Sequence, residues 1–82
     1  MATGDVTISV AIEGGVTKVA TVASAHRVKA IEYVNRNADP VYTDATWAVA
    51  MANKTGSGII HAANKQLAID AEPTPATFTA AT

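Results

Sequence analysis

Hydrophobic and polar residues alternate one by one near the start of the chain. Valine or isoleucine stands at every second position of Val6–Ile12. Small or polar residues lie between them, and Glu13 follows. This period of two is typical of a strand with one apolar face. Gly14–Gly15 then supplies two residues that tolerate positive φ, and Val16–Ala23 runs back. The pattern predicts a β-hairpin over residues 5–23.

A two-residue loop at Gly14 and Gly15 fixes the expected register of this hairpin. It pairs Ile12 with Thr17, Val10 with Val19, Ile8 with Thr21 and Val6 with Ala23. One face is then apolar along the first strand, and the second strand adds fewer apolar side chains to it. We expect a helix to cover that face, because a lone hairpin is only marginally stable.

An amphipathic helix is predicted next, over residues 24–37. Val28, Ile31 and Val34 recur at three-residue spacing, and Ser24 is a candidate N-cap. The alternative strand pattern is the poorer match, since it would place a glutamate among the apolar side chains.

Two more helices are predicted, over residues 44–54 and 57–71. Thr43 or Asp44 can cap the first of them. Gly56–Gly58 interrupts the pattern, and each glycine costs about 1 kcal/mol in a helix interior. We therefore favour two helices joined at the glycines over one long kinked helix.

The last ten residues carry two prolines, one aromatic side chain and no charge. Such a segment can reach about 33 Å when extended. Phe78 is a candidate anchor for a pocket on another chain. Strand addition to an exposed sheet edge would suit Thr74, Thr77 and Thr79. We expect residues 73–82 to form an extended C-terminal arm whose partner-binding residues include Pro73, Pro75, Phe78 and Thr79.

Together these elements predict an α+β fold, with an N-terminal β-hairpin, two or three short helices and the arm. Residues 1–72 are expected to form a single small domain. The side chains expected in its core are those of Val6, Ile8, Val10, Ile12, Val19, Val28, Ile31, Val34, Trp47, Met51, Ile59 and Leu67.

The composition predicts a small and weak core. Of the hydrophobic residues in the 82-residue chain, 18 are alanines, which bury little area, and 22 are larger. There is no cysteine to form a disulfide. We therefore expect stabilisation to come from oligomerisation or from docking on another protein. We expect a homo-oligomer.

The net charge of −1 gives no basic stripe for a nucleic-acid backbone, so nonspecific DNA binding is not expected. The first residues lack the basic and apolar regions of a signal peptide, and no run approaches the length of a membrane span. We expect the protein to be made and kept in a cytoplasm, with no membrane partner.

No residue cluster predicts catalysis, a metal site, a cofactor or a small-molecule substrate. His26 and His61 fall in different predicted helices without a third ligand. The serine in Gly56–Gly58 lacks the strand and helix context of a nucleophile elbow, and a flexible joint explains that triplet better. Lys54-Thr55-Gly56 lacks the glycine that a phosphate-binding loop places before its lysine. The sequence predicts a protein that is not an enzyme.

Trp47 is the one large aromatic residue in a region otherwise rich in alanine and methionine. A core anchor is the favoured interpretation, and an exposed hot spot for a partner is the alternative. The surrounding alanines allow close helix packing within or between chains.

The layout of residues 4–72 resembles small virion-associated structural proteins of tailed bacteriophages. The resemblance rests on the Thr/Val/Ile strand, Gly14–Gly15, the helix with Val28-Lys29-Ala30-Ile31-Glu32-Tyr33-Val34, and Thr43-Asp44-Ala45-Thr46-Trp47-Ala48 leading into alanine-rich helices. It implies a non-enzymatic virion component, such as a capsid decoration or cement protein that bridges subunits of the major capsid protein. Such a protein is assembled in the host cytoplasm.

A second hypothesis is a small dimeric DNA-binding regulator or antitoxin, in which Arg27, Lys29 and Arg36 would contact phosphates. Glu32 lies among these cations, and a solvated helix face explains them more simply. A third is an enzyme-associated accessory subunit or a peptide-binding subunit, which would bind a partner strand at the hairpin edge.

Overall fold

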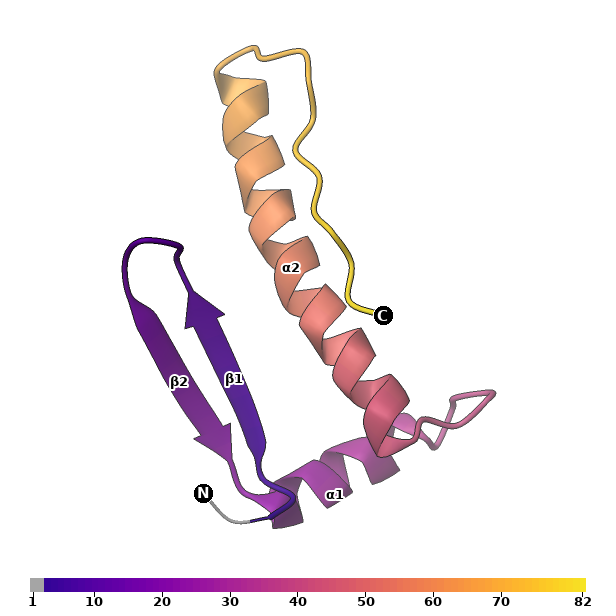
Figure 1. Cartoon of the computed structure of the whole chain (residues 1–82). Helices are drawn as coiled ribbons and strands as arrows, with labels where there is room; N and C mark the ends of the chain where they lie inside the picture. The colour runs from indigo at the N-terminus through magenta and orange to yellow at the C-terminus, as the bar shows by residue number, and fades with distance from the viewer. Residues whose placement is uncertain (1–2) are drawn as a thin grey trace. The chain divides into compact units, whose positions relative to one another are not determined.

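The chain divides into two compact units, Met1–Tyr42 and Thr43–Thr82. The computed structural model describes residues 3–82. The first unit holds two strands and a helix, and the second holds one helix and a C-terminal segment without regular secondary structure (Figure 1). The α+β class, with a hairpin first and helices after it, is confirmed. The boundary between the units falls inside the range predicted as one domain.

Strands β1 (Val6–Ala11) and β2 (Thr17–Val22) form the predicted antiparallel hairpin. The predicted register is wrong by one residue, because the loop has three residues rather than two. Gly15 N–H donates to the Ile12 carbonyl at 2.8 Å, and only Gly14 of the two loop glycines takes a positive φ, of 75°. Positive φ at the third residue is the mark of a type II turn.

The shifted register changes the composition of both faces of the hairpin. Val6 lies opposite Val22, Ile8 opposite Ala20 and Val10 opposite Lys18. Val19 therefore shares the other face with the threonines, opposite Ser9, instead of facing Val10. No residue of β2 is buried on either face.

Helix α1 (Ser24–Val34) is three residues shorter than predicted. Ser24 is not the N-cap: that position belongs to Ala23, whose side chain makes no cap bond. The carboxylate of Asp5 takes this role from a distance, accepting a hydrogen bond from Ser24 N–H at 2.9 Å. Arg27 Nε donates to the Gly4 carbonyl at 2.9 Å, so two bonds tie the chain before β1 to the first turn of α1.

Helix α2 (Asp44–Ile69) runs for 26 residues without a break, so the prediction of two helices at 44–54 and 57–71 is wrong. Its start is as predicted: Thr43 caps it, with a reciprocal pair of bonds to Thr46. A cost of about 1 kcal/mol for each interior glycine does not stop a helix that has hydrogen bonds on both sides of it.

The helix α2 ends in a chain reversal. Glu72 N–H donates to the Leu67 carbonyl and Ala71 N–H to the Ala68 carbonyl, the two bonds of a Schellman motif. Ala71 has a φ of 58°. It holds a left-handed position that glycine usually occupies.

No described residue of the chain is buried, so the predicted core is wrong for the chain on its own. Half of the twelve predicted core residues are half-buried. The exposed ones are Ile8, Val10, Ile12, Val19, Val28 and Ile59. Within the first unit, α1 does not cover the apolar face of the hairpin.

Candidate functional site

Three of the four asparagines in the chain bind a main-chain segment in the same way. Each side-chain amide accepts from the N–H of one residue and donates to the carbonyl of that same residue. Asn35 holds Tyr42 in this manner, with bonds of 2.7 and 3.1 Å, and so fixes the loop that follows α1. An amide can do this because its oxygen accepts and its nitrogen donates, as a peptide group does.

The other two asparagines lie on α2 and hold the C-terminal segment, residues 73–82. Asn64 accepts from Ala76 N–H at 2.6 Å and donates to the Ala76 carbonyl at 3.4 Å. Asn53 accepts from Ala81 N–H at 2.7 Å and donates to the Ala81 carbonyl at 3.4 Å. The segment therefore runs along α2 in the opposite direction to the helix (Figure 1).

The spacing of the two asparagines matches the spacing of the residues that they hold. Asn53 and Asn64 are eleven residues apart, about 16.5 Å along an α-helix, and about 20° apart around it. Ala76 and Ala81 are five residues apart, which is about 16.5 Å in an extended chain. The two amides thus reach two points of one segment that lies along the helix. We call the face of α2 that is formed by Asn53, Gly56 and Asn64 the asparagine clamp.

Gly56 forms a seat for the ring of Phe78 between the two amides. A Cβ on Gly56 would lie 2.9 Å from Cδ2 and 3.0 Å from Cε2 of that ring, closer than side chains pack. A Cβ on Gly58 would meet nothing within 4 Å. Gly56 therefore serves a contact inside the second unit, rather than the flexible joint that the sequence indicates.

Further half-buried residues extend the same face of α2. They follow Asn53 and Gly56 at alternating spacings of three and four, which keeps them on one side of a helix. They are Ile60, Ala63 and Leu67.

The residues predicted to bind a partner occupy different places in the second unit. Pro73 and Pro75 lie where the chain turns back after α2, and Thr79 is exposed in the segment. The Phe78 ring rests on Gly56 of its own chain and stays 44% exposed. Trp47 is half-buried near the start of α2. Contact of these residues with another chain stays a prediction.

The hairpin presents an open edge along β1. Ile12 N–H donates to the Val16 carbonyl, and hydrogen-bonded pairs alternate along an antiparallel ladder. The main-chain groups of Thr7, Ser9 and Ala11 accordingly point away from β2. No charged side chain lies in β1 to oppose pairing with another strand.

The three cations proposed as phosphate contacts have partners within the first unit. Arg27 donates to Gly4, and Lys29 forms an exposed ion pair with Glu32 at 3.5 Å. Arg36 lies 5.8 Å from the ring centre of Tyr33. The structure therefore does not gather them into a shared basic site.

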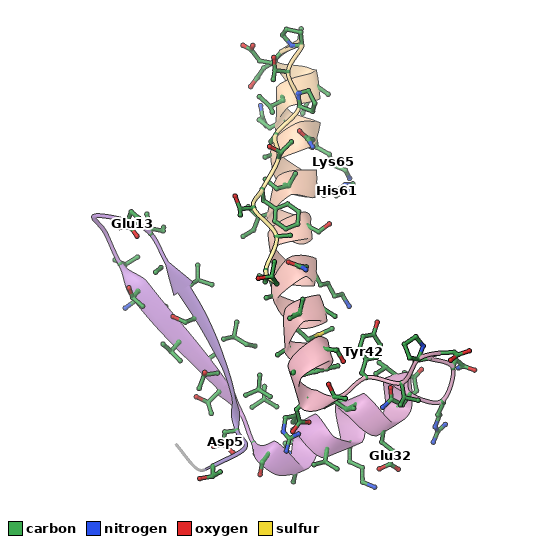
Figure 2. All side chains as sticks on the ribbon, turned by 45° about the vertical axis from the view of Figure 1, so that its right-hand side comes forward. Asp5, Glu13, Glu32, Tyr42, His61 and Lys65 are labelled. Atoms are coloured by element: carbon green, nitrogen blue, oxygen red, sulfur yellow. The ribbon has the colours of Figure 1, made fainter. Side chains whose placement is uncertain are left out.

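Among residues 3–82, no group of three or more histidine, cysteine or acidic side chains could hold a metal ion. His61 is exposed on α2, one turn from Lys65 (Figure 2). His26 lies in α1. Lys54 and Gly56 lie inside α2, away from the free N–H groups of a helix start. In the described part of the chain, no helix is long and apolar enough to cross a membrane.

Sequence reasoning missed the asparagine clamp. Neither Asn53, which directly precedes Lys54-Thr55-Gly56, nor Asn64 belongs to a sequence pattern that predicts binding of a main chain. The eleven-residue spacing becomes informative only once the C-terminal segment is known to turn back along the helix. Comparisons with protein-family models, curated proteins and solved structures find no match to this chain.

Proposed function

We propose that this chain is a non-enzymatic structural protein that assembles with other protein chains. In its specific form, it is a capsid decoration or cement protein of a tailed bacteriophage virion, where it binds its own copies and the major capsid protein. The observation that carries the proposal is the exposed apolar surface. Ile12 and Val19 of the hairpin are 63% and 57% exposed, and Ile59 and Ile69 of α2 are 60% and 77% exposed.

Exposed apolar side chains at this density support a role in binding protein. Single exposed hydrophobic residues are ordinary, but grouped ones mark interaction sites. The hairpin places the exposed side chains of Ile8, Val10 and Val22 together on one face. Its β1 edge offers main-chain groups to a partner strand as well. Both features suit a chain that is completed by its neighbours.

The resemblance in layout to small virion proteins supports the specific form of the proposal. In that form, residues 73–82 act as the extended arm, and Phe78 is its anchor on a neighbouring chain. Pro73, Pro75, Thr79 and Trp47 would contribute to the same contact.

Sedimentation of the protein from its native source tests this proposal. We expect it to migrate with a megadalton particle in many copies, and to remain with that particle after gradient purification. Recovery only as a free monomer or dimer would overturn the decoration role. In that case, salt-dependent retention on DNA would favour the regulator hypothesis, through Arg27, Lys29 and Arg36.

A further inference from the structure

The asparagine clamp binds the C-terminal segment through main-chain groups and one aromatic ring. The hydrogen bonds of Asn53 and Asn64 to the C-terminal segment go to the N–H and C=O groups of Ala81 and Ala76. The side-chain contact that the geometry requires is the Phe78 ring on Gly56. Each further copy of this chain carries a segment with the same main-chain groups and the same phenylalanine, so it can satisfy the clamp equally well.

The return of the segment to its own helix depends on one unfavourable backbone angle. Ala71 must adopt a φ of 58° to reverse the chain after α2. A Cβ disfavours this left-handed conformation, which glycine adopts freely. A segment that seats on a different copy does not need the reversal, so Ala71 can return to ordinary helical or extended angles.

Occupation within one chain also leaves the clamp partly open to solvent. Phe78 keeps 44% of its surface exposed, and both bonds of Asn53 lie at the surface. A second chain laid over the segment would cover this ring. The exposure of Phe78 is the same whichever copy supplies the segment, so the release of the Ala71 angle is what favours exchange between copies. Cover of the ring adds to it where the second chain also lies over the segment.

We infer that the asparagine clamp is an exchange site: residues 73–82 bind the α2 of a second copy in the assembled state, and their own α2 in the isolated chain. Asn53, Gly56 and Asn64 form the receiving face, and Ala71 is the hinge. This inference rests on the proposed function, because it names the contact through which copies assemble.

Complementation between two full-length variants tests the exchange. The first carries Asn53→Ala and Asn64→Ala, so it lacks the clamp but keeps the segment. The second carries Ala76→Pro and Ala81→Pro, so its segment lacks the N–H groups that the clamp binds. Sedimentation velocity with one variant labelled measures association, and circular dichroism verifies that both keep the helix content of the wild type.

We expect the wild type to associate with rising concentration and each variant alone to associate at least tenfold more weakly. Mixing the two variants should restore a heterodimer, because one supplies a clamp and the other a segment. Variants that associate as well as the wild type would overturn the exchange and leave assembly through other surfaces standing. A wild type that stays monomeric at every concentration would also overturn it, whereas the native-source sedimentation decides the proposed function separately.

The hinge gives an independent test that leaves both the clamp and the segment intact. Ala71→Gly removes the penalty on the reversed chain, so it should stabilise the monomer whose segment binds its own α2. Association between copies should therefore weaken about fivefold for each hinge. Ala80→Gly is the matched control, since it adds a glycine within the segment and away from the reversal. Equal association of the two variants would contradict the role of Ala71.

Discussion

The two glycines inside α2 provide a matched pair for testing the seat of Phe78. Gly56→Ala and Gly58→Ala make the same change two residues apart in one helix. Each replaces a helix-interior glycine, which favours the folded helix by about 1 kcal/mol. Only the first places a methyl group against the ring, at 2.9 Å from Cδ2.

The difference in stability between the two variants follows from the buried surface that the Phe78 ring loses when it is displaced. Phe78 is 44% exposed, so somewhat more than half of its surface is covered in the seat. For an aromatic side chain of roughly 200 Å², that burial contributes at most about 3 kcal/mol. Displacement of the ring therefore cancels or exceeds the gain in helix propensity at Gly56, and Gly58→Ala keeps that gain in full.

Thermal and urea unfolding followed by circular dichroism measure this difference. We expect Gly58→Ala to raise the midpoint by about 4–8 °C, while Gly56→Ala leaves it unchanged or lowers it. The free energies of unfolding of the two variants should differ by about 1 kcal/mol, because release of the segment limits the loss to its own net binding free energy. Chymotrypsin should also cut after Phe78 faster in Gly56→Ala than in Gly58→Ala.

A double-mutant cycle identifies the cause. In a Phe78→Ala background, both glycine substitutions should stabilise the chain equally, because the ring that distinguishes them is gone. Equal stabilisation by Gly56→Ala and Gly58→Ala in the wild-type background would refute the seat. A difference that persists without the phenylalanine ring would refute it as well.

Two further predictions concern the first unit. Asp5→Ala removes the carboxylate that accepts from Ser24 N–H, so it should lower the free energy of unfolding by about 1 kcal/mol and speed hydrogen exchange of that amide. Glu13→Ala, at the hairpin tip (Figure 2), removes the same charge and should have neither effect. Gly14→Ala places a Cβ at a φ of 75° and should cost about 1–2 kcal/mol in urea unfolding, whereas Gly15→Ala should be nearly neutral; equal costs would contradict the three-residue loop.

The hairpin could be predicted from the sequence, but its register could not. Alternation over Val6–Ile12 identifies a strand whatever lies across from it. The register depends on whether one or both of Gly14 and Gly15 take positive φ, and two adjacent glycines allow either loop. A shift of one residue then moved Val19 to the opposite face.

The errors in the helices have a common physical origin, which is contact between residues distant in sequence. Ser24 looked like a cap because it stands at the right place, yet the cap comes from Asp5, 19 residues earlier. Gly56 looked like a break because glycine disfavours helix, yet it makes room for Phe78. Local propensity contains neither partner, so local reasoning assigned both residues a local role.

The energetics of the clamp connect its geometry to a reversible role. Its four hydrogen bonds contribute about 1 kcal/mol each, and the seated ring at most about 3 kcal/mol. Ordering the six residues from Ala76 to Ala81 costs about 1 kcal/mol each or somewhat more. These opposing contributions nearly balance, so the segment binds its own helix only weakly. Any neighbour that covers the exposed part of the Phe78 ring shifts the balance toward the bound segment, because it buries apolar surface that the isolated chain leaves in water.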